Sequence, residues 1–138
     1  MGNLDRIGVS LDKKLLSQFD KLIEKQDYQS RSEALRDLVR KQLSEEKLEN
    51  PNAKAVGVVI LVYDHHATKL TESLIHLQHS HLPAKSMKII SSLHVHLDQH
   101  NCLEIIVIEG LVREINKVAQ NILSMKGVKL GRINIMAA

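Results

Sequence analysis

The sequence has 138 residues, 43% of them hydrophobic and 25% charged, with a formal net charge of +3, enough for one domain or two small ones. One Phe, two Tyr and no Trp argue against a base-stacking surface for single-stranded nucleic acid. A single cysteine excludes an internal disulfide framework and favours a reducing compartment. No signal peptide and no apolar run of membrane-spanning length is visible, so we expect a cytoplasmic protein without a membrane partner.

The first 49 residues predict a short strand followed by two helices. Apolar and polar side chains alternate over residues 6–11, which is the pattern of a strand with one buried face. Two apolar stripes at helical spacing follow, and Ser30 with Glu33 predicts a capping box at the start of the second helix. One strand and two helices do not close a core. We therefore expect an obligate dimer whose paired strands form a ribbon for the DNA major groove.

The segments "RIGVSLDKKLL" and "YQSRSEALRDLVR" resemble a ribbon-helix-helix DNA-binding module. The resemblance implies that the outward positions Arg6, Gly8 and Ser10 face the bases. The start of the second helix offers backbone N–H groups to a phosphate, and Asp27 stands where a helix-ending glycine is common. The alternative interpretation is that Arg6 and Ser10 form only the solvated face of a dimer strand.

The remaining residues predict a second domain over 55–138, after a linker at 50–54. Patterns of hydrophobicity predict strands at 55–63, 89–97, 103–108 and 128–135, and helices at 70–79 and 111–125. The resulting order is βαββαβ, a ferredoxin-like (ACT-like) sheet with helices on one face. The expected fold class is therefore α+β, and this fold does not by itself define a function.

All eight histidines lie between positions 65 and 100, and the only cysteine, Cys102, follows directly. His94 and His96 are two residues apart on a predicted strand, so both imidazoles face the same side. A turn at 98–101 brings Cys102 back toward them. Two imidazoles and a thiolate predict a partial metal site for zinc, copper, iron or nickel, and spacing alone does not separate these metals.

The motifs "YDHH", "LQH", "LHVH" and "HNCLE", placed behind the ribbon-helix-helix segment, are similar to the nickel-responsive regulator family, NikR. The resemblance implies a homotetramer, built as a dimer of dimers, whose central C-terminal domains bind Ni(II) at subunit interfaces, one ion per subunit. It also implies a repressor that binds a palindromic double-stranded operator and controls genes for nickel uptake or nickel enzymes.

Carried onto this sequence, the resemblance implies that His94, His96 and Cys102 are ligands from one subunit. His79 of "LQH" matches the fourth ligand, from a neighbouring subunit. The segment between His79 and His94 is longer here than in relatives, so His81 is an alternative fourth ligand.

Further residues match supporting positions of the family. Tyr63 and His65 match the family's "YxH" motif, and Glu104, two residues after Cys102, shares its strand face. Such groups can orient the ligands, although Glu104 fits a paired or solvated strand carboxylate equally well. Glu33 and Asp37 match positions that hold a second cation. His100 is interpreted as a turn residue and His66 as a solvated one.

Three other classes of protein share part of this pattern. A metal-buffering protein, or a regulator of zinc or copper, would use the same histidines and cysteine, but a buffer needs no ribbon. A metalloenzyme needs an open coordination position and an acid–base group, for which Glu104 is the nearby candidate. A ribbon-helix-helix antitoxin needs no histidine cluster. The whole pattern favours a regulator that is not an enzyme.

Overall fold

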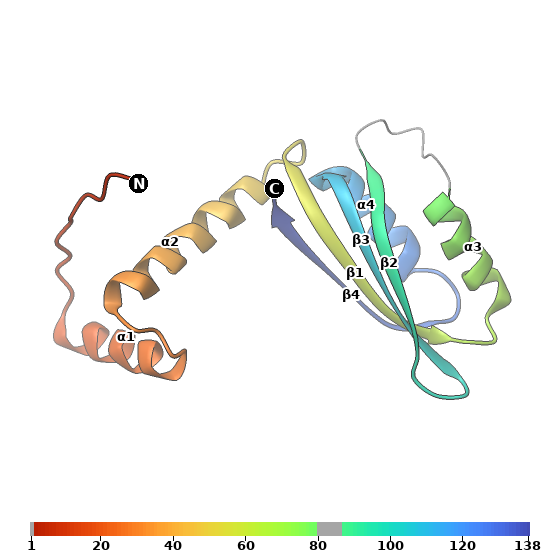
Figure 1. The fold of residues 1–138 in the computed structure, drawn as a ribbon, viewed down its shortest axis with the longest axis horizontal. Coiled ribbons are helices and arrows are strands. Elements are labelled where there is room, and N and C mark those ends of the chain that lie inside the picture. Colours follow the sequence, from red (N-terminus) through yellow and green to blue (C-terminus); the bar gives the residue numbers. More distant parts are fainter. Residues whose placement is uncertain (1, 80–86) are drawn as a thin grey trace. The chain divides into compact units, whose positions relative to one another are not determined.

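The computed structural model describes residues 2–79 and 87–138, which form two compact units, Met1–Gln42 and Leu43–Ala138 (Figure 1). The elements are α1 (Lys13–Lys25), α2 (Arg31–Leu48), β1 (Lys54–Asp64), α3 (Thr68–His79), β2 (Lys88–His96), β3 (Asn101–Leu111), α4 (Val112–Leu123) and β4 (Val128–Ala137). The division between the units falls inside α2, upstream of the predicted linker, and the domain limits at 49 and 55 stay a prediction.

Local hydrogen bonds explain where the two N-terminal helices begin and end. Oδ1 of Asp12 accepts the N–H of Leu15 at 2.8 Å and caps α1. After α1 the N–H of Tyr28 bonds to the carbonyl of Ile23, and Asp27 adopts a φ of 57° in the left-handed region. Asp27 therefore occupies the helix-ending position that glycine usually takes. Oγ of Ser30 accepts the N–H of Glu33 at 3.1 Å, which confirms Ser30 as the cap. The Glu33 carboxylate accepts the N–H of Gln29 at 3.3 Å, one residue before the position that the predicted capping box requires.

The predicted strand at 6–11 is not formed in the single chain. Residues 2–12 contain no helix or strand. A lone strand has no partner for its backbone N–H and C=O groups. The side chains of Leu4, Ile7 and Val9 are 85%, 78% and 58% exposed. Ala34 is the one buried hydrophobic residue among those described in this unit. The N-terminal unit therefore has apolar side chains suited to a core, but most of them are exposed in the single chain.

The C-terminal unit has the predicted βαββαβ order. Its four strands are arranged β2-β3-β1-β4, and each neighbouring pair is antiparallel. This is the ferredoxin-like topology, in which β3 lies between the two strands that α3 connects (Figure 1). Together with the N-terminal helices, it confirms the α+β class.

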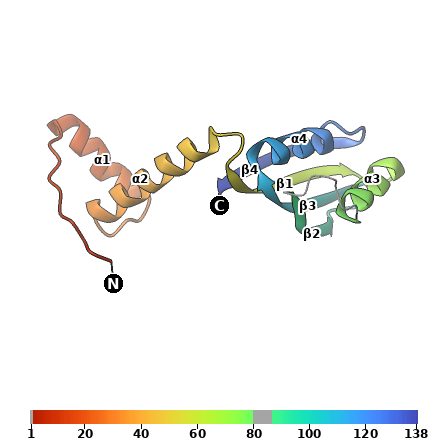
Figure 2. The ribbon, with the colours of Figure 1, turned by 90° about the horizontal axis from the view of Figure 1, so that it is seen from above.

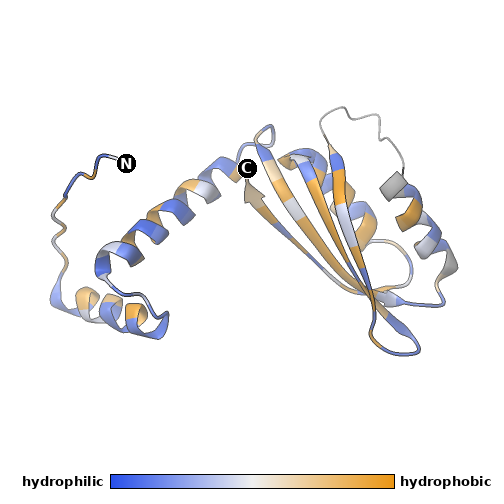
Figure 3. Ribbon diagram, viewed as in Figure 1, coloured by the Kyte–Doolittle hydropathy of each residue, from blue (hydrophilic) through white to orange (hydrophobic). Residues whose placement is uncertain are grey.

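The two helices pack on one face of this sheet, and α4 covers it closely (Figure 2). Gly57 makes the close approach possible, since a Cβ at that position would lie 2.5 Å from Cγ2 of Ile115. The strands themselves are rich in hydrophobic residues (Figure 3). On the face opposite the helices, Ile60, Leu93, Leu130 and Met136 are exposed to solvent.

Replacing Ile115 by Ala should destabilise the C-terminal unit by about 2–5 kcal/mol, because it removes a fully buried side chain between α4 and the sheet. Lys117→Ala, at an exposed position of the same helix, is the matched control. Thermal denaturation followed by circular dichroism measures both variants. Equal midpoints for the two would contradict the packing described for α4.

Candidate metal centre

The register of three neighbouring strands brings the candidate residues together. Cys102 on β3 pairs with Tyr63 on β1 and with His96 on β2. Two residues further along β3, Glu104 pairs with His94. Residues two apart on a strand face the same side, so all five belong to one face. The buried side chains of Tyr63, Cys102 and Glu104 mark it as the face that carries the helices.

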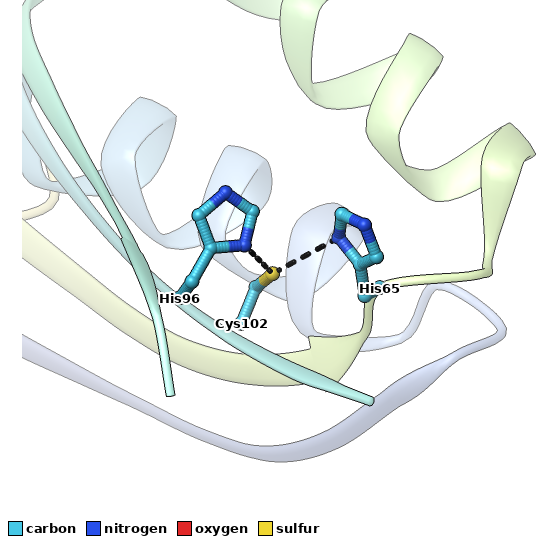
Figure 4. Close-up of side chains that lie close together, drawn as sticks. All are labelled: His65, His96 and Cys102. Carbon is cyan, nitrogen blue, oxygen red and sulfur yellow. Dashed lines mark hydrogen bonds between the residues drawn. The ribbon is translucent and has the colours of Figure 1, made fainter. Parts of the chain in front are cut away.

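Cys102 lies between two imidazoles (Figure 4). Its Sγ is 3.3 Å from Nδ1 of His65 and 3.4 Å from Nδ1 of His96. The ligand atoms of the three side chains all lie within 4.8 Å of one another, and only Cys102 is buried. One thiol and two imidazoles fit nickel, zinc or copper, whereas magnesium and calcium prefer oxygen ligands. The geometry therefore fits the kind of ion that the sequence predicts.

The Cys102 thiol is held in its protonated form in the absence of a metal. Burial raises its pKa, and the negative charges of Glu104 and Asp98 act in the same direction. A metal is bound by the thiolate, so binding must release the thiol proton. Metal affinity at this site should accordingly weaken as the solution becomes more acidic.

His94 is oriented by a buried carboxylate. Its Nδ1 donates to Oε2 of Glu104 at 2.7 Å, and the Tyr63 hydroxyl lies 3.1 Å from the same nitrogen. Burial and the Glu104 charge raise the pKa of Tyr63, so its hydroxyl stays protonated and donates to Oε2 of Glu104 at 3.4 Å. With Nδ1 engaged, Nε2 of His94 carries the lone pair that a metal would use.

The structure brings together three of the predicted ligands and one residue that was predicted only to support them. His94, His96 and Cys102 share one face, and the rings of His94 and His96 are 4.8 Å apart between centroids. His65 approaches the thiol directly, although the sequence suggested only a supporting position for it. The pairing of Tyr63 with Cys102 brings His65, two residues after Tyr63, near the thiol. The spacing of residues in the sequence does not reveal this strand pairing. The assignment of ligands stays a prediction.

The predicted fourth ligand is not tested here. His79 is the last residue of α3, but its side chain is not among those that the structure describes. The alternative ligand, His81, lies outside the described residues altogether. Both assignments stay predictions.

The predicted second-cation residues make local hydrogen bonds. Oε2 of Glu33 accepts the N–H of Gln29 at 3.3 Å, and Oδ2 of Asp37 accepts the Tyr28 hydroxyl at 2.9 Å. Arg40 also contacts Asp37, at 3.4 Å. Both carboxylates therefore have hydrogen-bond partners within the N-terminal unit. The second cation stays a prediction.

The predicted base-reading residues Arg6, Gly8 and Ser10 are all exposed in the single chain. Nothing lies within 4 Å of the position that a Cβ of Gly8 would occupy.

Comparison with known proteins matches each half of the chain to a different family model. Residues 5–46 match the model of the ribbon-helix-helix protein, copG family, and residues 56–136 match the NikR C-terminal nickel-binding domain. The chain belongs to the NikR family. It is 50% identical over 133 residues to a Geobacter sulfurreducens protein described as a nickel-responsive regulator, covering 96% of this chain and 93% of that protein. It is 46% identical over 136 residues to the corresponding protein of Lawsonia intracellularis, covering 99% and 95%.

The family confirms the sequence-based identification and the class of protein. NikR proteins are transcription regulators that combine a DNA-binding module with a nickel-binding domain, so this chain is not an enzyme. Among the described residues of this NikR chain, no helix is both long enough and apolar enough to span a membrane.

Replacing Glu104 by Gln should weaken nickel binding by about 10–100-fold, since it removes the charge that orients His94 without changing the size of the side chain. Glu109→Gln is the matched control. It alters another glutamate of β3, whose Oε2 lies 3.4 Å from Nζ of Lys88. This ion pair lies away from the thiol. Competition with a nickel chelator measures both affinities, and equal values would show that Glu104 does not support the site.

Proposed function

We propose that this NikR chain is a nickel-dependent repressor that binds a palindromic operator and controls genes for nickel uptake or nickel enzymes in the cytoplasm. The observation that carries the proposal is the thiol of Cys102 between two imidazoles, beside a third imidazole oriented by Glu104. This arrangement lies in the nickel-binding domain of a chain that begins with a DNA-binding module.

The proposed nickel ligands are His94, His96 and Cys102 of one chain and His79 of a neighbouring chain, with one Ni(II) per subunit. The shared strand register supports the first three, because it holds their side chains on one face. Three nitrogens and one thiolate suit a square-planar Ni(II) site. Tyr63, His65 and Glu104 then keep the ligands in place through hydrogen bonds.

Pairing of two N-terminal segments would form the DNA-reading ribbon. Ile7, Val9 and Leu11 are exposed in one chain, and burial between two chains would give them a core. The opposite face of the paired strands would then present Arg6, Gly8 and Ser10 to the base edges. The exposed apolar side chains support this dimer.

The open face of the C-terminal sheet supports a second interface. Ile60, Leu93 and Leu130 lie on that face, and Leu130 is 70% exposed. A second sheet packed there would remove these side chains from water. Two ribbon dimers joined through their C-terminal domains would form the proposed homotetramer.

Metal and DNA affinity are coupled if one assembled state favours both ligands. Nickel shared by two subunits would favour the state in which that interface is ordered. If the same state lets two ribbons reach two half-sites, metal raises DNA affinity and DNA raises metal affinity equally. Coupling of about 1–3 kcal/mol corresponds to about 5–150-fold.

Addition of Ni(II) should tighten binding to an operator duplex by about 5–150-fold. The duplex is enriched from a random-sequence library by repeated selection with nickel, and a gel shift measures its affinity. Zn(II) and Cu(II) serve as metal controls. The same affinity with and without Ni(II) would contradict nickel regulation, and a larger response to Zn(II) or Cu(II) would assign the sensor to that metal.

Two variants separate the halves of this function. Cys102→Ser should lose both the sulfur-to-nickel charge-transfer absorption and the nickel response. Arg6→Ala should lose operator binding while it keeps nickel binding and the oligomer. A Cys102→Ser protein that binds nickel as tightly as the wild type would remove the thiol from the proposed site.

Mixed tetramers should test whether His79 comes from another subunit. His79→Ala and His94→Ala chains would each bind nickel poorly alone. Refolded together, some interfaces would combine an intact three-ligand set with an intact His79, so a nickel titration should recover a fraction of the strong sites.

The alternative arrangements give different results in the same experiment. No recovery would contradict a His79 ligand donated between subunits. Replacing His81 by Ala in the wild-type background then identifies that residue as the fourth ligand if nickel binding is lost.

A further inference from the structure

Helix α4 begins without a side-chain cap. The residue before it, Leu111, makes no capping hydrogen bond through its side chain, although the first backbone N–H groups of a helix have no partner within the helix. Two of these groups bond to the linker instead. The N–H of Val112 donates to the carbonyl of Ala53, and the N–H of Arg113 donates to that of Pro51, both at 3.0 Å. The linker therefore caps the helix that covers the sheet of the C-terminal unit.

A side-chain hydrogen bond joins the same two segments. Nη1 of Arg113 donates to Oδ1 of Asn52 at 2.7 Å. Asn52 stands between the two residues whose carbonyls cap α4, so this bond holds the linker at the point where it meets the helix. A hydrogen bond from a charged donor is stronger than one between neutral groups. The guanidinium of Arg113 thus secures the cap.

The linker is also folded upon itself and tied to the end of α2. The N–H groups of Asn52 and Ala53 donate to the side chain and to the carbonyl of Asn50, each at 3.0 Å. The N–H of Asn50 bonds in turn to the carbonyl of Lys47, in the last turn of α2, at 3.3 Å. Leu48 and Ala53 are partly buried against the core of the C-terminal unit. The chain from α2 to β1 therefore follows a fixed path.

Helix α2 contributes residues to both compact units. The division falls after Gln42, so residues 43–48 of the helix are grouped with the C-terminal unit. The start of the same helix is part of the DNA-binding module matched over residues 5–46. One helix therefore carries the chain from the DNA-binding module to the capped linker.

The stiffness of this connection decides what a metal ion can change. A flexible linker sets an effective concentration for the second binding event, and that concentration does not depend on a ligand of one unit. Coupling requires that a ligand at one site favour a state that differs at the other site. Residues 49–53 contain one proline and no glycine, and their hydrogen bonds tie them to α4. A shift of α4 would therefore move the linker with it.

We infer that Arg113 and Asn52 are positioning residues for nickel-dependent operator binding. Neither belongs to the proposed nickel ligands or to the proposed base-reading positions. Their hydrogen bond keeps the carbonyls of Pro51 and Ala53 on the start of α4. The capped linker then passes the state of the C-terminal unit on to the DNA-binding ribbon. This inference rests on the proposed nickel-dependent function.

The test is the nickel response of the full-length protein, defined as the ratio of its operator affinities with and without Ni(II) in a gel shift. Asn52→Ala should lower this ratio by about 2–10-fold, since it removes one hydrogen bond without a change of charge. Arg113→Ala should lower the ratio to a similar extent. The double variant should have little further effect, because both changes remove the same hydrogen bond.

Two control variants separate the hydrogen bond from charge. Lys117→Ala removes an exposed cation one turn further along α4 and should keep the wild-type ratio. Arg113→Lys should keep part of the ratio that Arg113→Ala loses, because an ammonium can still donate to Oδ1 of Asn52. Equal loss of the ratio in Lys117→Ala would assign the effect to charge and overturn the inference.

Two further measurements separate positioning from folding. The nickel affinity and the thermal midpoint of Asn52→Ala should stay at the wild-type values, and their loss together with the ratio would overturn a positioning role. Hydrogen exchange should show that the amide hydrogens of Val112 and Arg113 are less protected in Asn52→Ala than in the wild type. Equal protection would show that the pair does not hold the cap and would also overturn the inference.

The same gel shifts distinguish this inference from the function on which it rests. A wild type whose operator affinity does not respond to nickel would overturn both. A wild-type response that Asn52→Ala and Arg113→Ala retain in full would overturn the inference alone.

Discussion

The register of β2, β3 and β1 is the constraint on which the metal centre depends. Cys102 is fixed opposite both Tyr63 and His96, and Glu104 is fixed opposite His94. A slip of one residue in either pairing would turn the side chains of that strand to the other face. The apolar residues of the same strands resist this slip, because Val59 and Ile106 are buried on the helix side of the sheet. The packing of the core therefore sets the geometry of the centre.

Glu104 has a positional role within this arrangement. A buried carboxylate loses hydration, and its hydrogen bonds with His94 and Tyr63 offset part of that loss. Its contribution to folding stability is therefore small, whereas its effect on the neighbouring ring is specific. By accepting from Nδ1 of His94, it fixes both the orientation of the ring and the nitrogen that remains available.

The sequence predicted the elements of the C-terminal unit well, since hydrophobic periodicity follows directly from burial. It also placed His94, His96 and Cys102 on one face, because two strands and a short turn leave little freedom. The contact between His65 and Cys102 was not predicted, as it depends on the pairing of β1 with β3. The strand at 6–11 was predicted together with a partner chain, and the single chain does not form it.

Each unit of the chain exposes apolar surface that a single copy leaves uncovered. In the N-terminal unit the uncovered side chains include Leu4 and Ile7, and in the C-terminal unit they include Leu130. Burial of such surface favours association by roughly 25 cal/mol for each Å² removed from water. A ligand that binds only the associated form adds to this free energy. If a neighbouring chain completes the nickel site, as proposed, one binding event would both hold the metal and stabilise the assembly.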